Sequence, residues 1–154
     1  MAVATNKSTF DIFQFDENQK KWISLPIEES QKKEISHTAS INEISWAPNL
    51  GRSYHLIATG CKDRSIIIWK FFQKENEQSN EPSQEINSSQ DSPVYVLEPE
   101  QKEIEHKSEV WHVEWNVTGT VLASSGDDGI VILWGRDYED KKNKKWKILM
   151  KYSK

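Results

Sequence analysis

Three residues in the second half of the chain carry the side chains of a charge-relay hydrolase. His106 offers an imidazole, Ser124 a hydroxyl and Asp128 a carboxylate, the groups that such an enzyme uses as base, nucleophile and orienting acid. The alternative is structural, because the same groups satisfy one another's hydrogen bonds when they are buried between strands. These three residue types alone leave both interpretations open.

The same set occurs a second time, with a tryptophan after each copy. The two tetrads are His37, Thr59, Asp63 and Trp69, and His106, Ser124, Asp128 and Trp134. The imidazoles are 69 residues apart (106 minus 37) and the hydroxyls 65 apart (124 minus 59), so one loop differs in length by four residues. A catalytic set need not occur twice, whereas a set that holds a repeated fold together must. We therefore predict that both tetrads are structural and that the chain is not an enzyme.

The segments around the tetrads have the pattern of short β-strands. Apolar residues recur with a period of two, and Gly, Asn and Asp separate the runs. In the second copy this pattern predicts strands over 111–115, 121–125 and 130–134, with Trp111, Val113 and Trp115 on one face. Residues 126–129 form the turn, and 145–152 supply a fourth strand. The sequence thus predicts an all-β fold, a partial propeller of about two and a half four-stranded blades.

The repeats divide the chain into parts of unequal completeness. A stretch at about 73–92 is rich in Gln, Glu, Asn and Ser, and we predict a disordered insertion there, between the third and fourth strands of a blade. Because two and a half blades cannot close a ring, we expect the sequence to be part of a longer protein. The predicted parts are the back half of a blade over 1–36, a blade with the insertion over 37–105, and a final blade with a basic tail over 106–154.

Composition excludes several classes of protein. With a net charge of −4 the chain has no basic field, so we expect no nucleic acid partner. The single Cys61 excludes an internal disulfide and a cysteine-based zinc site. Asp127 and Asp128 are adjacent on a turn and point apart, so we expect no metal there. We also expect no cofactor. No apolar run is long enough to span a membrane, so the protein is peripheral to a membrane at most.

Two further groups of charged residues have both a functional and a structural interpretation. His112 and Glu114 share a strand face, and we favour a surface pair over a catalytic one. A run of lysines near the C-terminus could contact phosphates, but lysines also protect an exposed strand edge from aggregation, and we favour that role. These lysines are Lys141, Lys142, Lys144, Lys145, Lys147, Lys151 and Lys154.

The segment 49–55 is longer than the tight turn of an ordinary blade. It contains Arg52 and Tyr54, two residue types that are enriched at binding hot spots. Together with Trp111 they are our candidate partner contacts. The alternative is that this loop packs on its own blade.

The repeats resemble WD-repeat propeller blades. His106 matches the Gly-His element, with Glu105 in place of Gly, and the Trp-Asp element is represented by 69–70 and 134–135 without its Asp. More narrowly, the runs 45–55 and 109–129 are very similar to the Seh-type nucleoporins, which are relatives of the COPII coat protein Sec-thirteen. This resemblance covers about residues 1–138, apart from the polar insertion.

The resemblance implies a scaffold without chemistry of its own. Its members form an open six-bladed propeller that a blade from a partner nucleoporin completes, in the Y-shaped coat of the nuclear pore complex at the nuclear envelope. It implies support of protein and mRNA transport, and also a vacuolar or lysosomal coat complex that relays amino-acid supply to TOR. The alternative is a COPII-type coat subunit at the endoplasmic reticulum, which the 49–55 loop and the 126–129 turn disfavour.

Overall fold

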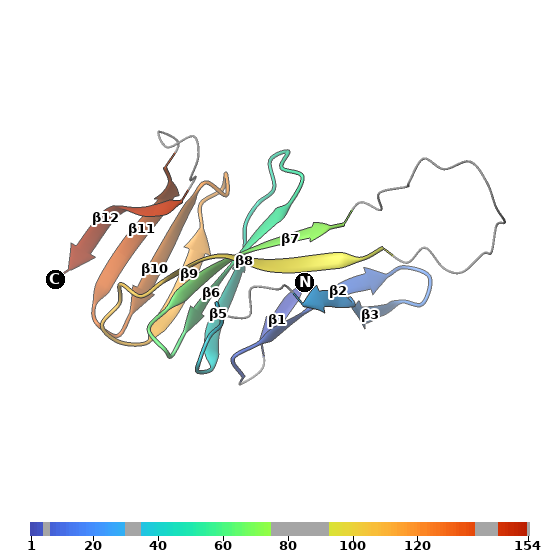
Figure 1. Cartoon of the computed structure of the whole chain (residues 1–154), viewed down its shortest axis with the longest axis horizontal. Coiled ribbons are helices and arrows are strands. Elements are labelled where there is room, and N and C mark those ends of the chain that lie inside the picture. Colours follow the sequence, from blue (N-terminus) through green and yellow to red (C-terminus); the bar gives the residue numbers. More distant parts are fainter. Residues whose placement is uncertain (5–6, 30–34, 75–92, 138–144, 154) are drawn as a thin grey trace.

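The computed structural model describes residues 1–4, 7–29, 35–74, 93–137 and 145–153. Within these residues the secondary structure is entirely β, which confirms the predicted fold class (Figure 1). The strands are β1 (Ala2–Ala4), β2 (Phe10–Asp16), β3 (Lys21–Ser24), β4 (Ile27–Glu29), β5 (Ile41–Trp46), β6 (His55–Cys61), β7 (Ile66–Gln73), β8 (Tyr95–Glu103), β9 (Val110–Trp115), β10 (Val121–Gly126), β11 (Ile130–Arg136) and β12 (Trp146–Ser153).

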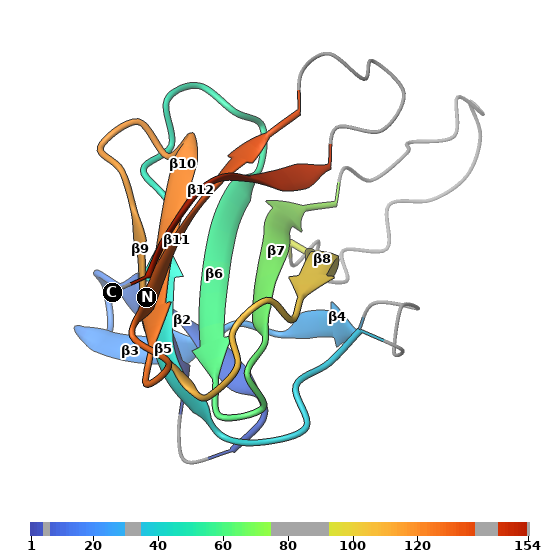
Figure 2. The same ribbon diagram turned by 90° about the vertical axis from the view of Figure 1, so that its left-hand side faces the viewer.

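The strands form three sheets in chain order. The first sheet has the order β1-β2-β3, the middle sheet β4-β8-β7-β6-β5, and the last sheet β12-β11-β10-β9. Apart from β4, consecutive strands within each sheet pair antiparallel. This pairing gives the up-and-down meander of a propeller blade. Figure 2 shows the last sheet nearly edge-on beside the middle sheet. The inner strands β5 and β9 contact each other, and β8 and β12 are the outer strands.

The turn between the second and third strands has the same geometry in the middle and last sheets. Arg64 has φ of 70° and Gly129 has φ of 68°, and these residues are 65 apart (129 minus 64). In each turn the preceding aspartate accepts the N–H two residues further on, at 3.0 Å, which is the chemistry of an Asx turn. The repeat therefore preserves a left-handed backbone position even where glycine is replaced by arginine.

The polar stretch at about 73–92 follows β7 and precedes β8, the third and fourth strands of the middle sheet, and that it is a disordered insertion stays a prediction. Residues 75–92 of it are outside the described residues. The strand β4 was not predicted: it adds a fifth strand to the middle sheet by pairing parallel with the start of β8, Ile27 opposite Tyr95. Lys74 Nζ lies 3.2 Å from Glu28 Oε2 across this junction.

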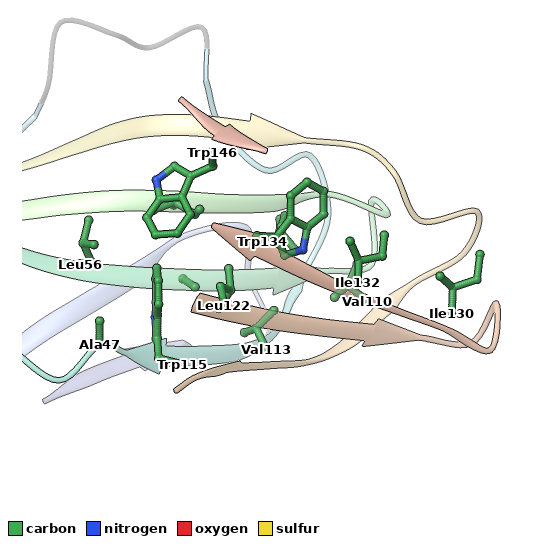
Figure 3. Packing of buried hydrophobic residues seen from close by; sticks show 13 residues of the cluster. Ala47, Leu56, Val110, Val113, Trp115, Leu122, Ile130, Ile132, Trp134 and Trp146 are labelled. Carbon is green, nitrogen blue, oxygen red and sulfur yellow. The ribbon is translucent and has the colours of Figure 1, made fainter. Parts of the chain in front are cut away.

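Two apolar cores lie between neighbouring sheets. The larger core fills the space between the middle and last sheets, where Figure 3 shows the side chains of Trp115, Trp134 and Trp146 among aliphatic residues. Trp115 and Trp146 pack edge to face with centroids 5.2 Å apart. The smaller core joins the first sheet to the other face of the middle sheet. The middle sheet is therefore covered on both faces.

The predicted shared face of β9 is wrong for Trp111. Val110, Val113 and Trp115 are buried, whereas Trp111 is 50% exposed. The register between β9 and β10 shifts between Ser125 and Gly126, so one residue of β9 is extra. Such a bulge breaks the alternation of side chains between the two faces, and the period of two fails at this residue.

Candidate functional site

The second tetrad forms a continuous chain of buried hydrogen bonds within the last sheet. Trp134 Nε1 donates to Ser124 Oγ at 2.9 Å, and Ser124 Oγ lies 2.9 Å from His106 Nε2. On the other side of the ring, His106 Nδ1 lies 3.1 Å from an Asp128 oxygen. A neutral imidazole with its proton on Nδ1 satisfies every one of these bonds.

The Asp128 carboxylate is held in its charged form. Burial raises the pKa of Asp128, but the N–H groups of Lys107 and Ile130 and the His106 ring outweigh burial and lower it overall. The Lys107 N–H donates to Asp128 at 2.8 Å, which ties the segment before β9 to the turn between β10 and β11. The tetrad thus joins three parts of one blade.

The first tetrad has the same geometry with one additional residue. Trp69 Nε1 donates to Thr59 Oγ1 at 2.9 Å, and Thr59 Oγ1 lies 2.7 Å from His37 Nε2. Ser65 then stands between the imidazole and the carboxylate: its Oγ is 3.0 Å from His37 Nδ1 and 2.5 Å from Asp63 Oδ1. Ser65 is not evident from the sequence repeat, because the matching position in the second copy is Ile130.

The buried environment fixes the charges of the first tetrad. Burial lowers the pKa of His37 to about 4, although the Asp63 charge acts in the opposite direction. Burial raises the pKa of Asp63, but the Ser65 hydroxyl and the N–H groups of Thr38 and Ser65 lower it well below its usual range. His37 is therefore neutral and Asp63 is charged at neutral pH.

A lysine from the outer strand extends each tetrad, a role that the sequence repeat does not reveal. Lys102 Nζ on β8 donates to the carbonyl of Ser36 at 2.6 Å, and Lys151 Nζ on β12 lies 3.5 Å from the carbonyl of Glu105. Each acceptor is the residue before the tetrad histidine. The two lysines are 49 residues apart (151 minus 102), whereas the tetrad hydroxyls are 65 apart. The polar stretch between β7 and β8 causes this difference, so the two lysines do not stand out as a repeat in the sequence.

His37, Cys61 and Asp63 bring possible metal-ligand atoms within 4.8 Å of one another. Each of these atoms already has hydrogen-bond partners. The Cys61 thiol donates to the carbonyls of Ala39 and Ser40 at 3.2 Å, and burial raises its pKa to about 11. The hydrogen-bonded network thus accounts for the closeness of these three side chains.

The 49–55 loop is bonded to the last sheet. Arg52 Nη1 donates to the carbonyl of Gly119 at 2.9 Å and Nη2 to that of Pro48 at 2.7 Å. Lys70 Nζ lies 5.1 Å from the centre of the Tyr54 ring, which packs against the larger core. Arg52 and Tyr54 thus have contacts within the chain, and of the three candidate partner contacts Trp111 is the most exposed. Their role toward a partner stays a prediction.

Polar contacts also join the inner strands of the two sheets. His112 Nε2 lies 3.5 Å from Glu114, the predicted surface pair, but His112 Nδ1 is closer to Glu43 of β5, at 2.7 Å. Glu43 also accepts the N–H of Val113 at 2.6 Å, and Asn42 Nδ2 donates to the carbonyl of Val110 at 3.0 Å. Side chains of β5 thus bind the backbone of β9.

The outer strands are joined by a second polar cluster, which we call the rim clamp and which consists of Glu100, Gln101, Arg136 and Trp146. The Gln101 amide accepts the Trp146 N–H at 2.8 Å and donates to the Trp146 carbonyl at 2.7 Å. Glu100 accepts from Arg136 Nη2 at 2.7 Å and from Trp146 Nε1 at 3.1 Å. The clamp fixes the start of β12 against β8.

One face of the last sheet repeats an interface of the middle sheet. In the middle sheet Leu56, Ala58, Ile66 and Ile68 face the last sheet, and each is at most 1% exposed. The residues 65 positions later are Val121, Ala123, Val131 and Leu133, which we call the terminal face. They alternate with core residues and point away from the middle sheet. None of the described elements covers this face, and Val131 is 40% exposed.

These sheets and their buried tetrads define a WD-repeat β-propeller architecture. The family model for the WD domain, G-beta repeat, matches residues 29–70 and 97–135, more than half of the chain. The chain belongs to this family. Among the described residues, we find no helix that is long and apolar enough to cross a membrane.

Among curated proteins, the chain is similar to nucleoporins named Seh1. It is 43% identical to nucleoporin seh1 of Schizosaccharomyces pombe over 109 residues, 66% of this chain and 32% of that protein. It is 37% identical to nucleoporin SEH1 of Bos taurus over 129 residues, which are 84% of this chain and 31% of that protein. It is 36% identical to nucleoporin SEH1-A of Xenopus laevis over 138 residues, which are 90% of this chain and 33% of that protein. The chain thus spans about a third of the length of these relatives, and the resemblance to Seh-type nucleoporins is confirmed.

Proposed function

We propose that the chain is part of a non-catalytic scaffold subunit of the Y-shaped coat in the outer ring of the nuclear pore complex. The relatives that carry the name nucleoporin support this assignment. In this role the protein lies at the nuclear envelope and supports the transport of protein and mRNA. A second assembly, at the vacuolar or lysosomal periphery and signalling amino-acid supply to TOR, belongs to the same proposal.

The observation that carries the scaffold role is the uncovered terminal face. The last sheet fully buries the matching face of the middle sheet. The terminal face has apolar residues at the same positions, so it has the composition of a blade-to-blade interface. Val131 is 40% exposed, so covering it contributes part of the roughly 1.5–3 kcal/mol gained when a fully exposed aliphatic side chain is buried. We propose that another blade covers the terminal face in the full-length assembly and that this blade comes from a partner nucleoporin.

The burial of the tetrads supports the non-catalytic part of the proposal. Ser124 is 1% exposed and His106 is 3% exposed, and both ring nitrogens of His106 are bonded within the blade. A nucleophile has to be within reach of its substrate. These hydroxyls instead accept the indole N–H of a tryptophan, which is a structural arrangement.

The test is affinity purification of the tagged full-length protein from its native cells. We expect structural nucleoporins of the Y-shaped coat to co-purify, and the variant Val131→Asp with Leu133→Asp to lose them while the protein stays folded. Val117→Asp is the matched control, since Val117 is 87% exposed on a turn. Recovery of COPII cage subunits without nucleoporins would replace this function by the vesicle-coat alternative. Retention of the nucleoporins by the double variant would show that the terminal face does not carry the interaction.

A further inference from the structure

The outer strands of the middle and last sheets occupy equivalent positions but differ in chemistry. In the sheet registers Ile67 lies opposite Lys102 and Ile132 lies opposite Lys151, so position n of β8 matches position n plus 49 of β12. On β8 the positions are occupied by a proline and polar residues: Pro99, Glu100, Gln101 and Glu103. Proline and charged residues on an edge strand disfavour the addition of a further strand at their positions.

The matching residues of β12 are apolar and exposed. They are Ile148, Leu149, Met150 and Tyr152, which are 38%, 49%, 45% and 57% exposed. The strand contains neither proline nor a carboxylate. No strand among the described residues pairs with its outer edge, because the order of the last sheet ends at β12. None of the features that protect β8 is therefore present at the same positions of β12.

The two lysines of β12 point to contacts inside their own blade. Lys147 Nζ lies 2.9 Å from Asp137, and Lys151 Nζ lies 3.6 Å from the Glu105 carboxylate as well as near its carbonyl. A lysine protects a strand edge when its charge stands in the path of an incoming strand. Both ammonium groups have carboxylates of this chain beside them, so these two of the lysines that we expected to protect the edge also serve the blade itself. Lys141, Lys142, Lys144 and Lys154 lie outside the described residues.

The middle sheet shows what an outer strand of this fold can bind. The short strand β4 pairs parallel with β8 over Tyr95–Leu97 and makes the middle sheet five-stranded. β4 comes from a distant part of the sequence, more than 60 residues before its partner. An extended segment can therefore add to the outer edge of a blade here, using the backbone N–H and C=O groups that the edge leaves open.

We propose that β12 is a strand-addition site that binds an extended segment of a partner protein with apolar side chains at alternate positions. The backbone groups of the outer edge of β12 pair with this segment. Met150 and Tyr152 lie opposite Leu133 and Val131, so they continue the terminal face to this edge and contact the apolar side chains that the segment presents on that face. The edge differs from the terminal face, since strand addition forms backbone hydrogen bonds in the plane of the sheet, whereas a covering blade packs against the side chains of the face. This inference rests on the proposed function in one respect, because the complex used in its test is the coat complex proposed above.

The test is hydrogen–deuterium exchange on the full-length protein, alone and within the natively purified coat complex. We expect alternate backbone amides over 147–152 to exchange at least about tenfold more slowly in the complex than in the free protein, because added backbone pairs protect amides. Leu149→Glu, Met150→Gln and Tyr152→Glu together give β12 the polar residues of β8 at these three positions and should abolish this protection. Val117→Glu, at an exposed turn, should leave it unchanged.

Two outcomes would overturn the inference. Equal exchange of these amides in both states, together with loss of the nucleoporins from Val131→Asp with Leu133→Asp, would leave the proposed function standing and remove the added strand. Protection in the free protein that rises with its concentration would mean that a second copy occupies the edge. If the triple variant does not fold, the comparison of free and bound wild-type protein still decides, and the absence of alternating protection contradicts the proposal.

Discussion

Trp134 and Ser124 are joined by an indole-to-hydroxyl hydrogen bond of 2.9 Å, and Trp69 and Thr59 repeat it at 2.9 Å one blade earlier. In both blades the tryptophan lies on the third strand and the hydroxyl on the second strand. The difference is burial: Trp134 is 1% exposed, whereas Trp69 is only partly buried. Two bonds of equal length should therefore differ in their contribution to stability.

Replacement of Trp134 by phenylalanine tests this difference. Trp134→Phe removes the donor to Ser124 and leaves space in the larger core, so we expect a loss of about 2–4 kcal/mol in the free energy of unfolding. Trp69→Phe should cost less, because solvent reaches its site. Chemical denaturation of both variants measures the two losses, and a larger loss for Trp69→Phe would contradict the expectation.

The lowered pKa of His37 predicts acid sensitivity at mildly acidic pH. The folded protein has a His37 pKa of about 4 against an ordinary value of 6.5. Between these values the unfolded chain binds more protons, so the free energy of unfolding falls as pH is lowered from 6.5 to 4. The full effect is about 3 kcal/mol. The lowered pKa of Asp63 acts in the same direction, but at lower pH, where the unfolded carboxyl begins to bind a proton.

Denaturation curves across this pH range test the assignment to His37. In His37→Gln the decrease between pH 6.5 and 4 should become much smaller, because the buried group that titrates is gone. His106→Gln is the matched control, because it removes a tetrad imidazole and leaves His37 in place. An unchanged pH dependence in His37→Gln would show that another group is responsible.

Gly119 has a backbone and a neighbour that exclude a side chain. Its φ is 62°, and a Cβ atom there would lie 2.5 Å from the carbonyl oxygen of Pro48. Gly129 has a similar φ of 68° with nothing within 4 Å of its Cβ position. We expect Gly129→Ala to cost about 1–2 kcal/mol for the left-handed backbone alone, and Gly119→Ala to cost more. Thermal unfolding compares the two, and equal losses would mean that the Pro48 carbonyl moves away without cost.

The rim clamp predicts that Gln101 controls the mobility of β12. Gln101→Ala removes both hydrogen bonds to the Trp146 backbone, so the amides at the start of β12 should exchange faster with solvent, and stability should fall by about 1–2 kcal/mol. The control is Gln14→Ala at an exposed position of β2. Unchanged exchange at β12 would show that Trp146 is held by packing alone.

The sequence by itself determined the class of fold and the tetrads. Strand residues recur with a period of two, and both tetrads keep their internal spacing apart from a four-residue loop difference. These are local or repeated features, so one copy supports the interpretation of the other. The polar stretch before Pro93 likewise identifies an insertion from composition alone.

Only the tertiary structure decided which residues meet across sheets and which faces stay open. Ser65 and the two outer-strand lysines have no repeated spacing that reveals them, and β4 joins a strand far away in the chain. A one-residue bulge turned Trp111 away from the core, which a period of two cannot predict. The terminal face and the edge of β12 are defined by what the neighbouring sheet does not cover, and coverage depends on how whole blades pack rather than on any local pattern.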